Sequence, residues 1–220
     1  MSYGALPVVI GEQVEIDCRE FMLYQYLPIK MVGEIAVTVE PRLGRFQRII
    51  GAACCDYIGF RGLDSWVAAY AYLTAKHTFL PPGTNQNRPG WHSDGFMTDD
   101  INYVWCDRLP TFYNSTAFDL TLDDEASLLE MAEQAQHRLS KQYPQNILLR
   151  LDQYCIHRCA DVTEPTVRTF VKVSISRDRY DLLGNSHNHL LDYDWPMRER
   201  SLLRNIPQRL PATEGVMHGS

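Results

Sequence analysis

Short strand-like segments dominate this sequence, and they restrict the fold more than any other feature. Segments of strand length, with alternating or clustered β-favouring residues, lie at 8–16, 34–40, 102–107, 146–158 and 168–176. The regular alternation of helices and strands that a parallel α/β sheet requires is missing. We therefore predict a mainly β fold, a sandwich or barrel with flanking helices on its outside.

Helices and loops are predicted at a few places only. Residues 43–60 begin like a helix, and 123–140 form the best helix, with Asp123 as its cap. Residues 81–90, dense in proline, glycine and asparagine, form the clearest loop. The length of 220 residues fits one domain, predicted as 1–207 with its core at about 75–180, followed by a flexible tail at 208–220.

Composition excludes several classes of protein. With 45% hydrophobic and 22% charged residues, the chain is neither disordered nor collagen-like, and no apolar run is long enough to span a membrane. Six cysteines, two of them adjacent, do not form an evident disulfide framework, so we expect reduced thiols and a cytoplasmic location. The net charge of −6 disfavours nucleic acid as a partner and favours a small-molecule substrate.

A His-x-Asp motif directly follows the predicted loop. His92 and Asp94 are two residues apart, so in an extended segment their side chains point to the same side and can share one divalent cation. A third ligand is available from His157, which lies 63 residues after Asp94 within a predicted strand. Two histidines and one carboxylate on one face of a metal leave three positions open, as in non-haem Fe(II) oxygenases.

The last predicted strand, 168–176, has two different faces. The odd-numbered positions from 169 to 175 carry residues that suit packing in a core. The even-numbered positions carry two cations, one aromatic ring and two hydroxyl groups: Arg168, Phe170, Lys172, Ser174 and Ser176. This second face is suited to line a cavity, where a guanidinium would bind a carboxylate through two parallel, charge-assisted hydrogen bonds.

Taken in this order, His92-x-Asp94, His157 and Arg168 resemble the motif of the 2-oxoglutarate- and Fe(II)-dependent oxygenase superfamily, over roughly residues 75–180. The resemblance implies a double-stranded β-helix, also called a jelly roll, of the cupin-like kind. It implies that the two histidines and Asp94 hold Fe(II) as the catalytic centre. The 2-oxoglutarate would chelate the iron and place its C5 carboxylate on Arg168, and O2 would take the last position. Hydroxylation or desaturation of an organic substrate is the implied reaction.

Further cosubstrate contacts follow from the same resemblance. Many members of the superfamily have a small hydroxyl residue two positions after the arginine, where this chain has Phe170. Lys172 lies on the same strand face and is an alternative cation for the cosubstrate. Asn102 and Tyr103, on the strand after the motif, are candidates for contacting it.

Other interpretations of these residues stay open. Cys155, His157 and Cys159 alternate and could bind zinc together with His92, although same-face strand positions roughly 6.5–7 Å apart fit poorly around one ion. A 2-oxoglutarate-independent cupin-type metalloenzyme and a non-enzymatic binding or assembly protein on a vestigial barrel are further alternatives. A nucleobase in nucleic acid is an alternative substrate, and the basic stretch 195–209 is either a phosphate-facing patch or a solvated helix face.

Overall fold

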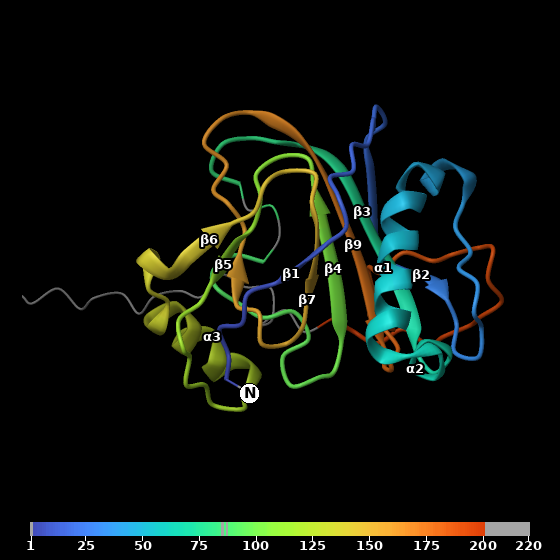
Figure 1. The fold of residues 1–220 in the computed structure, drawn as a ribbon. Coiled ribbons are helices and arrows are strands. Elements are labelled where there is room, and N and C mark those ends of the chain that lie inside the picture. The colour runs from blue at the N-terminus through green and yellow to red at the C-terminus, as the bar shows by residue number, and fades with distance from the viewer. Residues whose placement is uncertain (1, 85, 87, 201–220) are drawn as a thin grey trace, which may run out of the picture.

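Two antiparallel β-sheets form the framework of the computed structural model, which describes residues 2–84, 86 and 88–200 (Figure 1). The larger sheet has the strand order β1 (Val8–Ile10), β7 (Leu148–Leu151), β4 (Ile101–Cys106), β9 (Thr166–Ser176), β3 (Tyr70–Leu80) and β2 (Met22–Lys30). The smaller sheet has the order β6 (Ser140–Gln142), β5 (Phe112–Asn114) and β8 (His157–Arg158). The predicted mainly β fold with flanking helices is therefore confirmed, and the arrangement is consistent with a β-sandwich.

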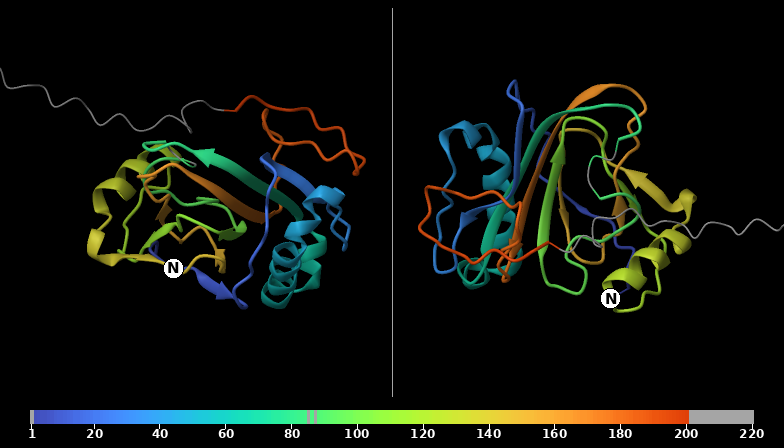
Figure 2. Two further views of the ribbon diagram at one scale, coloured as in Figure 1. Left: turned by 90° about the horizontal axis from the view of Figure 1, so that it is seen from above. Right: turned by 180° about the vertical axis from the view of Figure 1, so that it is seen from behind.

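Two helices cover one face of the larger sheet. The 3₁₀ helix η1 (Pro41–Phe46) leads into α1 (Gln47–Arg61), and the short α2 (Leu63–Val67) follows. Figures 1 and 2 show both α-helices on the side of the larger sheet away from the smaller one. Ile49, Ile50 and Ala53 of α1 are at most 1% exposed and form a core with apolar side chains of β2, β3, β4 and β9. This core supports the sheet from behind and leaves its other face available for a site.

Alternation along the central strands separates the two faces of the larger sheet. On β9, Val171, Val173 and Ile175 belong to the core beneath α1. Phe170 and Lys172, on the opposite face, line a cavity. The two faces predicted for this strand are confirmed, because the side chains of an extended strand alternate with a period of two.

The third helix, α3 (Asp124–Gln134), lies beside the smaller sheet (Figure 1). It begins as predicted, since the Asp123 carboxylate accepts hydrogen bonds from the N–H groups of Glu125 and Ala126 at 3.0 and 2.9 Å. It ends before the predicted boundary, because Ala135 takes up extended backbone and the chain continues through the 3₁₀ helix η2 (His137–Leu139) into β6.

Replacing Asp123 with alanine should lower the free energy of unfolding by about 1 kcal/mol, because two N–H groups lose their acceptor. Urea denaturation would measure this loss. Glu133→Ala, on an exposed position of the same helix, is the matched control and should change stability by less than about 0.5 kcal/mol. Equal losses in the two variants would contradict the capping role.

The predicted strand at 34–40 is wrong. This segment has no strand geometry, although the N–H of Thr38 donates to the carbonyl of Ile29 at 2.7 Å and keeps the segment beside β2. Val37 and Val39 pack against the main core from this position. The alternating sequence therefore reflects one-sided packing of an irregular segment.

The single strand predicted at 146–158 is also wrong, because the segment forms two strands, β7 and β8, in different sheets. Asp152 makes the turn between them: its carboxylate accepts from the N–H of Tyr154 at 3.0 Å, and its carbonyl accepts from the N–H of Cys155 at 3.1 Å. This turn carries the chain from the larger sheet to the smaller one.

None of the helices in the described residues is long and apolar enough to cross a membrane. The predicted tail at 208–220 lies outside the described residues.

Candidate metal centre

A backbone pairing between distant segments brings two histidines together. The N–H of His92 donates to the carbonyl of His157 at 2.9 Å, and the N–H of His157 donates to the carbonyl of His92 at 2.8 Å. His157 begins β8, whereas His92 follows the proline- and glycine-rich loop, so this bridge ties the loop to the smaller sheet. The two imidazole centroids are consequently 4.5 Å apart.

Both imidazoles are oriented by a backbone carbonyl two residues earlier. Nδ1 of His92 lies 3.0 Å from the carbonyl oxygen of Gly90, and Nδ1 of His157 lies 2.9 Å from that of Cys155. Because a carbonyl only accepts, each Nδ1 carries the proton, and each Nε2 keeps its lone pair for a ligand. Outer hydrogen bonds of this kind fix the tautomer and ring orientation of metal-binding histidines.

Asp94 completes the cluster. Its Oδ2 lies 3.8 Å from Nε2 of His157 and 3.0 Å from Nζ of Lys172, whose ammonium also donates to the hydroxyl of Tyr26 at 3.1 Å. One ligand atom each from His92, Asp94 and His157 lie within 4.8 Å of one another, a spacing that fits a single metal ion. The structure therefore brings together the three residues predicted as ligands.

The turn after Asp94 depends on a glycine. Gly95 has φ +72°, and a Cβ there would lie 2.8 Å from Oγ1 of Thr98 and 2.9 Å from Cβ of Asp100. A side chain at this position would therefore displace the turn that aims Asp94 at the histidines.

Burial and charge set the protonation of the cluster. Burial, followed by repulsion from His157, lowers the pKa of His92 to about 3, and burial also lowers the pKa of His157. Burial opposes ionisation of Asp94, but Lys172 and the two imidazoles hold the pKa of its carboxyl well below the ordinary value. At neutral pH the cluster thus consists of two neutral imidazoles and one carboxylate, the forms that bind metals.

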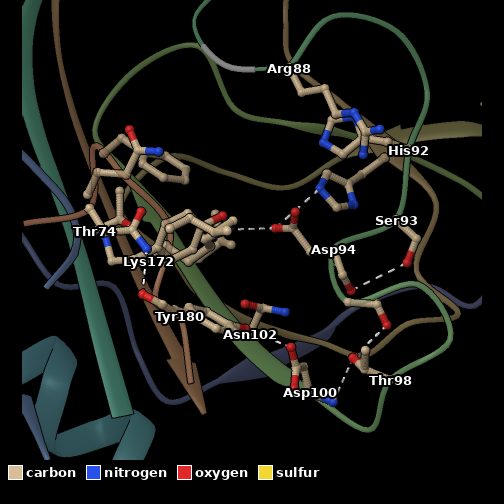
Figure 3. A pocket seen from close by; sticks show the side chains of 18 of the residues that line it. Thr74, Arg88, His92, Ser93, Asp94, Thr98, Asp100, Asn102, Lys172 and Tyr180 are labelled. Carbon is tan, nitrogen blue, oxygen red and sulfur yellow. Dashed lines mark hydrogen bonds and ion pairs between the residues drawn. The ribbon is translucent and has the colours of Figure 1, made fainter. Parts of the chain in front are cut away.

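A cavity of about 470 Å³ opens from this cluster between the two sheets. Figure 3 shows Asp94 between Lys172 and His92, with Asn102 and Tyr180 along the wall. Besides the three candidate ligands, the lining includes Tyr26, Lys76, Arg88, Asn102, Lys172 and Tyr180. The strands β2, β3, β4 and β9 supply most of them, which is why the cavity lies over the face of the larger sheet opposite α1.

Of the four residues predicted to bind the cosubstrate, two line the cavity and two, Tyr103 and Arg168, are not among its lining residues. Lys172 and Asn102 line the cavity, and Oδ1 of Asn102 accepts from the Ser174 hydroxyl at 2.6 Å. Tyr103 points to the opposite face of β4, where its hydroxyl donates to Asp56 of α1 at 2.7 Å. The expectation that Tyr103 contacts the cosubstrate is therefore corrected, because neighbouring residues of a strand point to opposite faces.

Arg168 lies on the predicted face of β9 but is not among the residues that line the cavity. Its Nε donates to the carbonyl of Arg108 at 2.8 Å and its Nη2 to that of Leu109 at 3.4 Å. Its guanidinium carbon stands 4.9 Å from the centroid of the Phe170 ring. The structure thus places Arg168 next to the cavity wall, with part of its guanidinium bound to backbone.

The alternative zinc site, made of Cys155, His157, Cys159 and His92, does not form in the described residues. Cys155 packs in the interior between the sheets, where burial raises the pKa of its thiol to about 12. Cys159 lines the cavity, but within the described residues the group that could hold a metal contains histidines and Asp94 only. The strand that was expected to align the two thiols with His157 extends over two residues only.

Two lining residues, Lys76 and Tyr26, were not predicted from the sequence. Lys76 lies on the cavity face of β3, and burial, followed by repulsion from Lys172, lowers its pKa to about 8. Strand alternation places Lys76 on the same face as Thr74, which also lines the cavity, so this pattern could have identified Lys76 from the sequence. Tyr26 sits with φ +47° where the register of β2 shifts, and no sequence pattern marks that irregularity.

Comparisons with known proteins give no close relative. No family model matches the chain, and no curated protein matches it. The chain is similar to the crystal structure of EvdO2 from Micromonospora carbonacea var. aurantiaca, with 17% identity and a TM-score of 0.38 over 62% of this chain and 60% of that chain. The same protein complexed with 2-oxoglutarate gives 16% identity and a TM-score of 0.39, over 63% and 66% of the two chains.

A 2OG-Fe(II) oxygenase family oxidoreductase from Burkholderia pseudomallei gives 13% identity and a TM-score of 0.37, over 79% of this chain and 73% of that chain. The match to EvdO2 spans about 60% of that protein's length. At these identities and TM-scores, the similarity carries no argument about the reaction of this chain. Any functional conclusion depends on its own site.

Proposed function

We propose that this chain is an Fe(II)- and 2-oxoglutarate-dependent dioxygenase on a double-stranded β-helix, hydroxylating or desaturating a small molecule. The observation that supports this proposal most is the cluster of His92, Asp94 and His157 in the wall of a cavity. Two imidazoles and one carboxylate form a facial set that suits non-haem iron and leaves positions for a chelating cosubstrate and O2.

The donor set fits a metal without rearrangement. Both Nε2 lone pairs are available because the Nδ1 protons are bound to carbonyls, and the carboxylate of Asp94 is ionised. The bond from Lys172 to Oδ2 fixes the orientation of the Asp94 carboxylate beside the imidazole of His157. The residues of this chain thus orient three ligands before any metal arrives, which lowers the cost of binding.

Positive charge at one end of the cavity supports the proposed binding of 2-oxoglutarate. Lys76 and Lys172 line this end, and Arg168 lies close enough for its charge to lower the pKa of Lys76 further. A dicarboxylate placed here would relieve the repulsion among the three cations, so we propose that Lys76 and Arg168 bind the C5 carboxylate. When bound with iron, 2-oxoglutarate and O2 supply oxidising power, and the products of the cosubstrate are succinate and carbon dioxide.

A metalloenzyme that does not use 2-oxoglutarate is the second candidate, and one observation favours it. The guanidinium of Arg168 already donates to the carbonyls of Arg108 and Leu109, which uses some of the donors that a carboxylate clamp needs. On this alternative, Lys76 and Lys172 would bind the anionic part of a substrate instead.

Anaerobic titration with Fe(II) and then with 2-oxoglutarate distinguishes these candidates. The dioxygenase should bind one iron and then develop the visible charge-transfer band of 2-oxoglutarate chelated to Fe(II). Iron binding without the band would favour the second candidate. Failure to bind iron in the purified protein would contradict both.

Arg168→Ala should weaken 2-oxoglutarate binding by about 10–100-fold, because charge-assisted hydrogen bonds contribute about 1.5–3 kcal/mol each. Iron affinity should stay unchanged, since Arg168 has no contact with the three ligands. Titration of the charge-transfer band measures both quantities. The control is Arg177→Ala, an exposed arginine near Asp99, and unchanged 2-oxoglutarate affinity in Arg168→Ala would remove this residue from the cosubstrate site.

A further inference from the structure

A continuous row of aromatic rings runs from the candidate metal centre to the molecular surface. We call it the aromatic ladder, and its members in order are Tyr26, Tyr180, Tyr72, Tyr70, Trp195 and Tyr193. Successive ring centroids are 5.1, 4.2, 6.0, 5.5 and 4.7 Å apart. Beyond Tyr193, the exposed ring of His187 follows at 4.5 Å.

The inner end of the aromatic ladder touches the residues that hold the metal ligand. The Tyr26 hydroxyl accepts a hydrogen bond from Nζ of Lys172, which itself donates to Asp94. Tyr26 meets Tyr180 edge to face, and Figure 3 shows Tyr180 on the cavity wall below Lys172. Tyr26 therefore lies two hydrogen bonds from a candidate iron ligand, and Tyr180 follows through its ring contact with Tyr26.

Tyr180 also has a proton acceptor. Its hydroxyl donates to Oδ2 of Asp100 at 2.6 Å, a short contact to a carboxylate that is 5% exposed. Burial raises the pKa of the Asp100 carboxyl, so this carboxylate is a better proton acceptor than an exposed one. A phenol loses an electron much more readily when its proton can move to a base bonded to it, whereas the hydroxyl of Tyr72 donates to a backbone carbonyl, that of Asp178.

The middle of the aromatic ladder is shielded from solvent and its outer part is not. Tyr72 is fully buried and stacked on Tyr180 with an angle of 9° between the rings. Trp195 lies in the segment after β9, packs edge to face on Tyr70 of β3, and has a half-buried indole. An indole gives up an electron without needing a proton acceptor, so Trp195 is suited to receive electrons from a donor in solution.

From these contacts we infer that Tyr180 and Asp100 form a redox-active pair, which the aromatic ladder connects to reductants in solution. The inference rests on the proposed function, because the oxidant is the metal centre after O2 has reacted there without a substrate. Tyr180 would give one electron to that centre and its phenolic proton would move to Oδ2 of Asp100, which would leave a neutral tyrosyl radical. A thiol or ascorbate then supplies one electron through Trp195, Tyr70 and Tyr72, and the proton returns from Asp100 to Tyr180.

This path would protect the site. An oxidising equivalent without a substrate otherwise attacks neighbouring side chains, and the cavity contains oxidisable ones, including the thiol of Cys159. Two one-electron passes through the aromatic ladder, with two protons taken up from solvent, would return the metal to Fe(II) and release the bound oxygen as water before such damage.

The first test needs no iron. The full-length metal-free protein is illuminated with ruthenium tris(bipyridine) and persulfate, which generate a one-electron oxidant in solution, and is then frozen for EPR. Wild type should give a persistent tyrosyl signal, and Tyr180→Phe, which keeps the ring, should lose most of it. Asp100→Asn, which removes the proton acceptor but keeps the shape, should lose it similarly. The control is Tyr24→Phe, a tyrosine bonded to Glu40 outside the ladder, which should match wild type.

The second test uses the iron-loaded protein with 2-oxoglutarate, ascorbate and air, in the absence of a substrate. Mass spectrometry should find oxidised cavity residues accumulating faster in Trp195→Leu than in wild type, with ascorbate protecting wild type only. A Tyr180→Phe signal equal to wild type in the first test would overturn the inference. So would equal accumulation in Trp195→Leu and wild type in the second. If the protein binds no iron, the proposed function fails, while the first test still decides whether Tyr180 is the redox-active residue.

Discussion

Asp94→Ala should lower the affinity of the protein for Fe(II) by more than about 100-fold. Changes to residues that merely orient a metal ligand already cost about 10–100-fold, and here a ligand itself is lost. Two imidazoles alone would remain, without the negative charge that the carboxylate brings to the ion. Anaerobic competition with a chromophoric Fe(II) chelator would measure the affinity, and an unchanged value would remove Asp94 from the ligand set.

The same substitution should destabilise the metal-free protein. Lys172 is 7% exposed, and without Asp94 its ammonium would lie buried beside the Tyr26 hydroxyl with no opposite charge. Removing one partner of a buried ion pair costs about 3–5 kcal/mol in the free energy of unfolding. The double variant Asp94→Ala/Lys172→Met is the control. It should recover most of the stability measured in urea while iron affinity stays low, so the two effects of Asp94 can be separated.

Lys76→Met should stabilise the metal-free protein at pH 7 by about 3 kcal/mol, since the pKa of Lys76 is lowered from 10.5 to about 8 in the folded state. Below pH 8 the lysine is charged in both states, and the folded state bears the full cost of burying that charge. Between pH 8 and 10.5 the unfolded chain still holds the proton that the folded chain has released, so wild-type stability rises with pH. The advantage of the variant should therefore disappear near pH 10.5.

The gain in stability of Lys76→Met should be accompanied by weaker binding of 2-oxoglutarate. If Lys76 binds the C5 carboxylate, the variant should bind 2-oxoglutarate about 10–100-fold more weakly, with normal iron affinity. Urea denaturation at pH 7 and pH 10, together with titration of the charge-transfer band, measures both effects. Lys141→Met, at an exposed position of β6, should alter stability by less than about 0.5 kcal/mol and leave 2-oxoglutarate binding unchanged. A destabilised Lys76→Met protein at pH 7 would show that burial of this charge carries no penalty.

The sequence was informative wherever local rules decide the structure. The two faces of β9 followed from strand alternation, and the cap of α3 from the residue type of Asp123. The grouping of His92 and Asp94 with His157 was predicted from order and spacing, although it depends on a backbone bridge between remote segments. Their role as iron ligands remains a prediction that the experiments above address.

The orientations of Tyr103 and Arg168, which the sequence did not predict, depend on tertiary contacts. Tyr103 was assigned to the site because it lies on the strand after the His-x-Asp motif, but its pairing with Asp56 belongs to the packing of α1 on the sheet. The orientation of the Arg168 guanidinium depends on where the carbonyls of the loop after β4 lie. Neither feature has a local signal, since both are set by segments about 50 residues or more away in the chain.

The walls of the cavity come from separate stretches of the chain. The three candidate ligands belong to positions 92–94 and 157, whereas another part of the lining comes from the stretch 178–200, including Arg179, Asn185 and Arg200. If the proposed function holds, substrate selectivity and oxidative chemistry would therefore depend on different stretches of the chain. A chimera that exchanges the stretch 181–200 should acquire a new substrate preference and still assemble the same iron centre, which makes this segment the natural target for directed evolution.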